Sequence, residues 1–324
     1  MKRKYFISLD YNCNFPKEKE RTEIKYDFRK FDCGELEITF PKKKNKIYYN
    51  QIAKSTKKTI KENNSKNDTV YIYQSFTREK FNEGLIKLFI ICCILNENYN
   101  DTQKLNITYI APFLPYMRQK EEKSNFLLKN IFQICGIKTV MTYDLHYHYN
   151  DENYSICSSE SNIKKLFVSA MPLFIKDIRK QHKDSINKIV IVFPDKGAKD
   201  RFFNYFKEDF ATFCLKKIRD KNDNVTIYTN DDTKNLKNKK AIIIDDMIDT
   251  GKTVIEATNF LVKNGIKSVD IYATHGIFSG NSIKKLNENK NIKSIAISDS
   301  IKYSNSKNNK LPKKFRVIKL NPNL

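Results

Sequence analysis

One short segment constrains the fold of this chain more than any other feature. It begins with four apolar residues, 241–244. A run of acids, threonines, a glycine and a lysine follows: Asp245, Asp246, Asp249, Thr250, Gly251, Lys252 and Thr253. The apolar run predicts a strand that is buried on both faces. Apolar residues then recur at helical spacing up to Gly265, which predicts a helix directly after the loop. We therefore expect the loop at the carboxyl end of a parallel strand, where open α/β sheets bind ligands.

The residues of this loop suit a sugar phosphate. The adjacent carboxylates of Asp245 and Asp246 can accept hydrogen bonds from neighbouring hydroxyl groups. Thr250 and Thr253 lie at the expected helix N-terminus, where backbone N–H groups and the helix dipole favour a phosphate. A helix cap alone requires one Asp or Thr, not three acids in five positions. Residues 251–253 spell the end of a Walker A loop, but Asp246 stands where that motif needs its first glycine.

Strands and helices alternate along the chain. The N-terminal half contains apolar runs that predict strands and longer periodic runs that predict helices: strands at 70–74, 107–111 and 139–145, and helices at 78–96 and 124–135. The C-terminal half repeats the plan, with helices at 167–180 and 202–209 and a strand at 188–193. This alternation predicts an α/β fold of mostly parallel sheets flanked by helices.

Two polar segments interrupt the alternation. Residues 150–162 are the expected hinge, which divides the chain into domains of residues 1–150 and 151–324. Residues 221–240 are too polar for a core and predict a mobile loop or hairpin over the site. A chain of 324 residues is long enough for two such domains.

The bulk composition excludes several classes of protein. The formal net charge is +23, but the lysines are spread along the chain without a recognisable nucleic-acid module, so no specific nucleic-acid partner is expected. The longest apolar run, residues 88–95, is far shorter than the roughly twenty residues that span a bilayer, so no membrane partner is expected. Seven cysteines without a Cys-x-x-Cys pair, and an N-terminus without a signal sequence, predict a cytoplasmic protein with reduced thiols.

The acidic loop resembles the sugar-phosphate loop of the type I phosphoribosyltransferases. Five further segments, in collinear order, resemble motifs of the ribose-phosphate pyrophosphokinase (PRPP synthetase) family: residues 31–35 (Phe-Asp-Cys-Gly-Glu), 112–119 (Pro-Phe-Leu-Pro-Tyr-Met-Arg-Gln), 142–146 (Thr-Tyr-Asp-Leu-His), 193–198 (Phe-Pro-Asp-Lys-Gly-Ala) and 272–280 (Tyr-Ala-Thr-His-Gly-Ile-Phe-Ser-Gly). Because these segments span nearly the whole chain, the sequence is similar to a divergent member of that family.

The resemblance implies two tandem phosphoribosyltransferase-like domains, with an ATP site in the first and the ribose 5-phosphate loop in the second. It also implies a reaction. The β,γ-diphosphoryl group of ATP moves to the 1-hydroxyl of ribose 5-phosphate and gives 5-phosphoribosyl-1-diphosphate (PRPP) and AMP, with Mg²⁺ as the cofactor. A dimer-based homo-oligomer, such as a hexamer, is implied in the same way.

Matching positions in the family motifs imply roles for single residues. The implied catalytic residues are Lys217, Arg219 and His146, and the implied Mg²⁺ ligands are His146 and Asp195. The implied ATP contacts come from the first half of the chain: Phe31, Glu35, Arg118 and Gln119. The implied ribose 5-phosphate contacts are the seven polar residues of the acidic loop: Asp245, Asp246, Asp249, Thr250, Gly251, Lys252 and Thr253.

Several of these roles have simpler alternatives. Asp195 can serve only as the cap of a helix, and His146 can be an ordinary histidine at a strand end. Lys216 aligns with the family lysine nearly as well as Lys217 does. Residue 33, a cysteine, replaces a family acid near the adenine ring, and residue 252, a lysine, replaces the usual glycine of the phosphate loop.

Two other functions are consistent with the sequence. One is a regulatory homologue that binds nucleotide or sugar phosphate but catalyses weakly, and the presence of His146 and of the basic pair Lys217 and Arg219 argues against it. The other is a phosphoribosyltransferase that joins PRPP to a base. Such an enzyme does not need a second, nucleotide-binding half.

Overall fold

The structure is a computed structural model that describes residues 4–9, 21–23, 26–39, 69–77, 80–96, 106–117, 122–146, 162–220, 225–229, 231–303 and 311–320. The chain divides into two compact units. Unit 1 comprises Met1–Thr142, Tyr149–Phe167 and Asn321–Leu324, and unit 2 comprises Tyr143–His148 and Val168–Leu320. This division differs from the expected boundary at residue 150, because the strand Lys164–Val168 adds to the sheet of unit 1.

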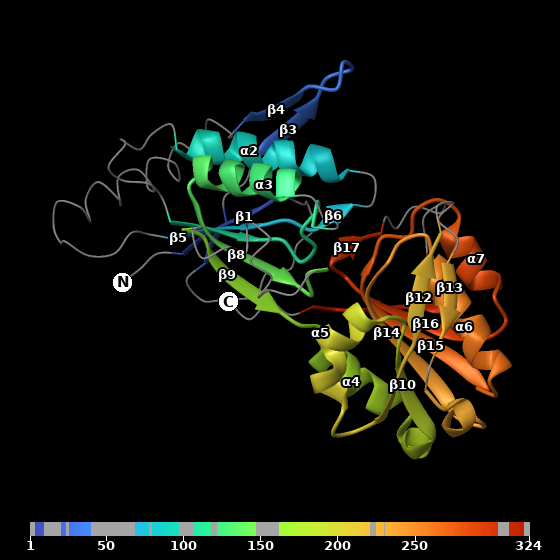
Figure 1. Ribbon diagram of the computed structural model, residues 1–324. Helices are drawn as coiled ribbons and strands as arrows, with labels where there is room; N and C mark the ends of the chain where they lie inside the picture. The colour runs from blue at the N-terminus through green and yellow to red at the C-terminus, as the bar shows by residue number, and fades with distance from the viewer. Residues whose placement is uncertain are drawn as a thin grey trace. The chain divides into compact units, whose positions relative to one another are not determined.

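Unit 1 is built on a six-stranded sheet of order β2-β1-β5-β7-β8-β9. Its strands, in chain order, are β1 Lys4–Ser8, β2 Arg21–Glu23, β5 Thr69–Tyr73, β7 Asn106–Ile110, β8 Ile137–Tyr143 and β9 Lys164–Val168. The pairs from β2 to β8 are parallel. Helices α2 (Phe81–Asn96) and α3 (Glu122–Ile134) lie side by side over one face of this sheet (Figure 1). A hairpin of β3 (Asp27–Lys30) and β4 (Leu36–Thr39) and the short strand β6 (Phe76–Thr77) complete the described elements of the unit.

Unit 2 is built on a second six-stranded sheet of order β11-β10-β14-β15-β16-β18, in which all the pairs are parallel. Its strands are β10 Ile189–Phe193, β11 Ala211–Cys214, β14 Lys240–Ile248, β15 Ser268–Gly276, β16 Ile292–Ser298 and β18 Phe315–Ile318. The remaining elements are α4 Met171–Gln181, α5 Lys196–Phe206, α6 Lys252–Lys263, α7 Ser282–Glu288, the 3₁₀ turns η1 Lys183–Lys188 and η2 Thr233–Leu236, the hairpin of β12 Lys216–Arg219 and β13 Val225–Tyr228, and β17 Ile301–Lys302.

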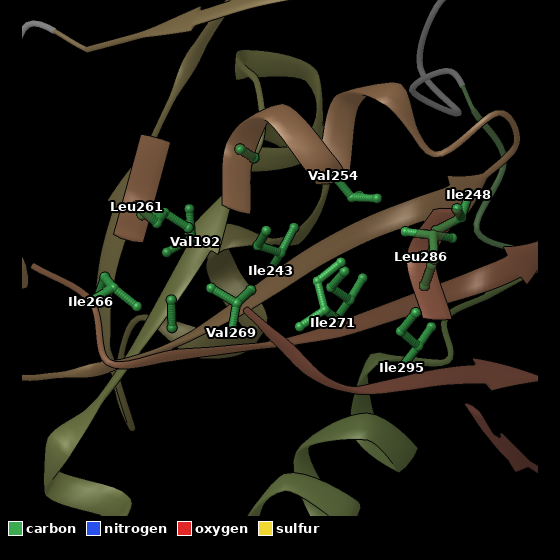
Figure 2. Close-up of a cluster of buried hydrophobic side chains, with 14 of the residues drawn as sticks. Val192, Ile243, Ile248, Val254, Leu261, Ile266, Val269, Ile271, Leu286 and Ile295 are labelled. Carbon is green, nitrogen blue, oxygen red and sulfur yellow. The ribbon is translucent and has the colours of Figure 1, made fainter. Parts of the chain in front are cut away.

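The core of unit 2 explains why its strands read as continuous apolar runs. Alternate strand residues such as Val192, Ile243 and Ile271 pack against the apolar faces of α6 and α7, which carry Leu261 and Leu286 (Figure 2). Residues of opposite orientation pack against the other two helices, as in the ring contacts of Tyr272 with Phe174 of α4 and of Phe193 with Phe206 of α5. Both faces are therefore buried, as expected for a parallel sheet.

The expected fold class is confirmed, and three predicted elements differ from the observed limits by four residues or more at one end. The helix expected at 167–180 begins at Met171, since Lys164–Val168 forms strand β9 and Pro172 suits the first helical turn. The helix expected at 202–209 begins at Lys196, because Asp195 caps it. The strand expected at 241–244 extends to Ile248, so two of the acids lie in the strand and not in the loop.

Two other expectations concern polar segments. Part of the segment 221–240 forms strand β13, which pairs with β12 in an antiparallel hairpin, and η2. The hinge expected at 150–162 lies outside the described residues, apart from residue 162. Among the helices that the structure describes, none has the length and apolar character required to cross a bilayer.

Candidate active site

The turn between β14 and α6 has a backbone that only glycine adopts readily. Gly251, the N-cap residue of α6, has φ 78° and ψ −4°, in the left-handed region. A Cβ atom at this position would lie 3.3 Å from Cγ of Leu286. Helix α6 begins at Lys252, so its first N–H groups and the positive end of its dipole are directed toward the turn. This arrangement suits a phosphate group.

Asp246 is the more deeply buried member of the acidic pair. Its Oδ2 lies 2.8 Å from Nδ1 of His146, and its Oδ1 accepts a hydrogen bond of 2.8 Å from Nη2 of Arg201. Burial alone would raise the pKa of Asp246, but the charge of Arg201 and the hydrogen bond from His146 hold it well below its ordinary value. The predicted contact between Asp246 and ribose stays a prediction, and both carboxylate oxygens already have partners within unit 2.

The pKa of Asp245, the neighbouring acid, is shifted in the opposite direction. Its Oδ1 accepts a hydrogen bond of 2.9 Å from the backbone N–H of Asp246. Burial, followed by the negative charge of Asp246, raises the pKa of Asp245 well above its ordinary value. The pKa values of the two adjacent acids are therefore shifted in opposite directions, and Arg201 lies 2.8 Å from Asp246 but 3.9 Å from Asp245.

A second polar cluster lies within unit 2 near the ends of β8 and β15. Oδ2 of Asp144 accepts a hydrogen bond of 2.6 Å from the hydroxyl of Thr274. Nε2 of His275 lies 3.1 Å from the carbonyl oxygen of Tyr143, and its Nδ1 lies 2.9 Å from the hydroxyl of Ser300. Burial raises the pKa of Asp144 and lowers the pKa of His275 to about 4. The sequence motifs assigned no role to these residues, although Asp144 lies in the matched segment 142–146 and Thr274 and His275 lie in the matched segment 272–280.

Asp195 joins helix α5 to the hairpin β12–β13. Its Oδ1 accepts a hydrogen bond of 2.9 Å from the N–H of Ala198, so Asp195 caps α5. Its Oδ2 also lies 2.5 Å from Nζ of Lys217. Burial would raise the pKa of Asp195, but the charge and hydrogen bond of Lys217 and the N–H of Ala198 lower it below its ordinary value. Lys216 has its Nζ 6.0 Å from the ring centroid of Tyr228, so Lys217 is the lysine that contacts Asp195.

Four further predicted site residues belong to unit 2. Arg219 is in β12 and pairs with Val225, and its side chain is outside the described part of the structure. Thr250 is exposed, whereas Lys252 and Thr253 are half-buried in the first turn of α6. Their predicted contacts with ribose 5-phosphate stay predictions.

The residues predicted to bind ATP belong to unit 1. Phe31 and Glu35 close the β3–β4 hairpin, where the N–H of Phe31 donates a hydrogen bond of 2.9 Å to the carbonyl oxygen of Glu35. The guanidinium carbon of Arg29 lies 4.5 Å from the centroid of the half-buried Phe31 ring. Residues 118 and 119, the predicted arginine and glutamine, lie outside the described residues. Their contacts with nucleotide stay predictions.

The predicted Mg²⁺ ligands fit an ion that is bound mainly by substrate. Within the described ranges, no three His, Cys, Asp or Glu side chains converge as a protein cage would require. Mg²⁺ rarely uses such a cage, since it usually takes one or two protein ligands together with substrate phosphates and water. The carboxylate of Asp195 already binds one cation, the ammonium group of Lys217 at 2.5 Å. The roles of His146 and Asp195 as Mg²⁺ ligands stay predictions.

Comparison with known proteins identifies relatives of this chain. The family model of the phosphoribosyl transferase domain matches residues 168–306. Ribose-phosphate pyrophosphokinase A of Dictyostelium discoideum is 32% identical over 244 residues, which cover 72% of this chain and 71% of the relative. Ribose-phosphate pyrophosphokinase of Cereibacter sphaeroides is 29% identical over 248 residues, which cover 74% of this chain and 69% of the relative.

A solved structure extends the similarity of fold to nearly the whole chain. The crystal structure of phosphoribosylpyrophosphate synthetase from Mycobacterium smegmatis has a TM-score of 0.71 and covers 98% of this chain and 95% of its own. Its sequence identity is 20%, so it supports the fold alone. The sequence relatives carry the assignment further, because the Dictyostelium protein is 32% identical over 72% of this chain. The chain therefore belongs to the ribose-phosphate pyrophosphokinase family of enzymes.

Proposed function

We propose that this protein transfers the β,γ-diphosphoryl group of ATP to the 1-hydroxyl of ribose 5-phosphate and releases PRPP and AMP. The observation that carries the proposal is the contact of 2.5 Å between Lys217 of the hairpin and Asp195 at the start of α5. It brings a cationic side chain to a carboxylate in the same unit as the acidic loop. Diphosphoryl transfer depends on such cations, because the transition state spreads negative charge over the phosphate oxygens.

Ribose 5-phosphate would bind at the turn between β14 and α6. The N–H groups of the first turn of α6, together with Thr250 and Thr253, would receive the 5-phosphate. Asp245 and Asp249 would accept hydrogen bonds from the ribose hydroxyls. The left-handed conformation of Gly251 allows the chain to turn tightly between the acids and the helix.

ATP would bind through the residues of unit 1 that the sequence singled out. The ring of Phe31 would stack on adenine, and Glu35, Arg118 and Gln119 would contact the nucleotide. In the reaction, O1 of ribose 5-phosphate attacks the β-phosphorus, and the bond from that phosphorus to the α,β-bridging oxygen breaks with AMP as the leaving group. Lys217 and Arg219 would neutralise the developing charge. Mg²⁺, when bound by His146 and Asp195, would neutralise charge on the ATP phosphates.

We propose a dimer-based homo-oligomer in the cytoplasm without a specific nucleic-acid or membrane partner.

A ³¹P NMR assay with purified protein, ATP, ribose 5-phosphate and Mg²⁺ tests the proposal. We expect PRPP and AMP in equal amounts, and neither product when EDTA removes Mg²⁺ or when ribose replaces ribose 5-phosphate. If neither product forms although ATP or ribose 5-phosphate binds, the proposal is wrong and a regulatory homologue explains the site. Consumption of PRPP with a purine or pyrimidine base, without ATP, would instead identify a phosphoribosyltransferase.

A further inference from the structure

Arg201 is a largely buried arginine that contacts two residues of the candidate site and that the sequence motifs did not single out. It lies on α5, and its side chain is 11% exposed. Nη1 donates a hydrogen bond of 2.6 Å to the carbonyl oxygen of His146, and Nη2 donates one of 2.8 Å to Oδ1 of Asp246. One guanidinium group thus holds the backbone of one candidate residue and the side chain of another.

The contacts form a closed ring. Oδ2 of Asp246, the oxygen that Arg201 does not hold, lies 2.8 Å from Nδ1 of His146. The three residues come from α5, from β14 and from the segment after β8, so the ring joins parts of unit 2 that are distant in sequence. Because the carboxylate of Asp246 can only accept, the proton of a neutral His146 ring lies on Nδ1. The lone pair of that neutral ring is then on Nε2.

Burial separates this ring from an ordinary surface ion pair. The side chain of Asp246 is 2% exposed and that of Arg201 is 11% exposed. A guanidinium group is planar and rigid, so it can fix the orientation of a carboxylate, whereas a lysine ammonium acts as a point charge. An oriented carboxylate in turn fixes the ring plane and the tautomer of the histidine that it binds. Carboxylates that orient ligating histidines commonly act in this way.

We propose that Arg201 is a positioning residue, which orients the carboxylate of Asp246 and through it the imidazole of His146, with Nε2 as the reactive nitrogen. The expected loss of turnover rests on the proposed function. The inference also separates the two adjacent acids of β14: Asp245 remains for the substrate, whereas Asp246 acts on the protein. Arg201 therefore affects catalysis through His146 and does not contact the reacting atoms.

Kinetics of Arg201→Lys and Arg201→Met test the effect on turnover. Loss of the partner that orients a ligating histidine typically lowers activity by about 10–100-fold, so we expect a loss of kcat in this range for Arg201→Met. The loss should be smaller for Arg201→Lys, which keeps the charge but cannot make both hydrogen bonds at once. KM for ribose 5-phosphate should change little in both variants. Adding Asp246→Asn to Arg201→Met should cost little more, because both changes act through His146.

NMR of protein labelled with ¹⁵N-histidine tests the geometry without any turnover. The chain has only four histidines, and His146→Gln assigns the signal of interest. At a pH where the ring is neutral, we expect Nδ1 of His146 to carry the proton in the unmodified protein. In Arg201→Met, a mixture of the two tautomers should appear, because Asp246 is no longer held.

Arg316 provides a matched control in the same unit. Its Nη1 lies 2.7 Å from Oδ2 of Asp177, and its Nη2 lies 3.0 Å from the hydroxyl of Tyr272, so it also joins a carboxylate to a second polar group. None of these three residues is a candidate site residue. Arg316→Met should lower the melting temperature but leave kcat and the His146 tautomer unchanged.

The outcomes are distinguishable. If Arg201→Met keeps the kcat and the tautomer of the unmodified protein, or if Arg316→Met changes both to the same extent, Arg201 is only structural and the inference fails. If Arg201→Met does not fold, Arg201→Lys must show the same two changes at a smaller size. If the unmodified protein makes no PRPP, the proposed function fails, whereas the NMR measurement still decides whether Arg201 sets the His146 tautomer.

Discussion

The two units share an architectural plan and differ in what they bury. Each contains a six-stranded sheet flanked by helices and one antiparallel hairpin. In the described part of unit 1, the buried polar side chains are neutral: Gln74, Ser75, Thr108 and Thr142. Unit 2 buries ionisable side chains as well: Asp144, Asp246, Asp270 and His275. Topology therefore does not separate the units, but the chemistry of their strand ends does.

The strand ends illustrate the difference in physical terms. After β5 in unit 1, Oε1 of Gln74 accepts a hydrogen bond of 2.7 Å from the hydroxyl of Tyr109, which satisfies a neutral group with a neutral partner. In β14 of unit 2, Asp246 requires both Arg201 and His146, since an unpaired buried carboxylate is strongly destabilising. Unit 2 thus places oriented charge where unit 1 places a neutral amide.

The hairpins of the two units also differ in their ionic contacts. The variant with the largest predicted effect tests this difference. Lys217 of β12 lies 2.5 Å from Asp195, whereas the turn of the β3–β4 hairpin is largely exposed. Lys217→Ala should lower kcat by about 10³-fold, because a cation that acts on a phosphoryl transition state contributes an effect of this order. Binding of ribose 5-phosphate, measured by calorimetry, should change little.

Lys216→Ala is the matched control for that prediction. Nζ of Lys216 lies 6.0 Å from the centroid of the Tyr228 ring, and Lys217 is the lysine that contacts Asp195, so kcat of Lys216→Ala should stay close to that of the unmodified protein. The reverse result, in which only Lys216→Ala loses turnover, would transfer the catalytic role to Lys216. Loss of ribose 5-phosphate binding in Lys217→Ala would indicate that the hairpin supports the acidic loop and not the transition state.

Much of unit 2 follows from patterns that are local in sequence. The apolar run before Asp245 predicts a buried strand, and the apolar spacing from Val254 to Leu261 predicts the buried face of α6. The predicted first residue of helix α5 and the predicted last residue of strand β14 were wrong. A helix cap determines the first limit, and pairing with a neighbouring strand determines the second. Strand limits depend on hydrogen bonds to segments that are distant in the chain.

The buried network could not be predicted from the same patterns. Arg201 is one of many basic residues in the sequence, and no local feature shows that its guanidinium reaches His146 and Asp246. The adjacent acids look equivalent in sequence, yet Arg201 is 2.8 Å from one and 3.9 Å from the other. Contacts between residues separated by 45 and 55 positions set the electrostatic state of the site, and only the fold brings them together.

The pH dependence of stability tests the difference between the neutral buried side chains of unit 1 and the ionisable buried side chains of unit 2. All four histidines of the chain belong to unit 2. The pKa of His275 is about 4 in the folded protein, below the ordinary value of 6.5, because the ring is buried. A lowered histidine pKa means that its contribution to stability is present above pH 6.5 and is lost as the pH falls toward 4. The loss amounts to about 3 kcal/mol in the free energy of unfolding.

Urea unfolding of the unmodified protein and of His275→Gln at pH 7.5 and at pH 4.5 measures this contribution. We expect the unmodified protein to lose more stability than His275→Gln between the two pH values, since glutamine does not titrate. Other groups titrate in both proteins and cancel in the difference. An equal loss in both proteins would mean that His275 is not buried as a neutral ring.

The smallest predicted effect compares one glycine from each unit. Gly251 has φ 78° and Gly136 has φ 72°, so alanine at either position should cost about 1–2 kcal/mol of stability through left-handed strain. At Gly136, the new Cβ would meet only the side chain of Asn96, at 3.5 Å. At Gly251, it would approach the buried Leu286 at 3.3 Å, so Gly251→Ala should be the more destabilising change in urea unfolding.

Function separates the two glycines more clearly than stability does. Gly251 is the residue that turns the acidic loop into α6, whereas Gly136 ends α3 in unit 1. Gly251→Ala should therefore raise KM for ribose 5-phosphate, because the N–H groups of the first turn of α6 would shift away from the 5-phosphate, and Gly136→Ala should leave KM unchanged. Equal KM values in the two variants would mean that the 5-phosphate does not bind at this turn. The difference between the units would then consist of the buried charges alone.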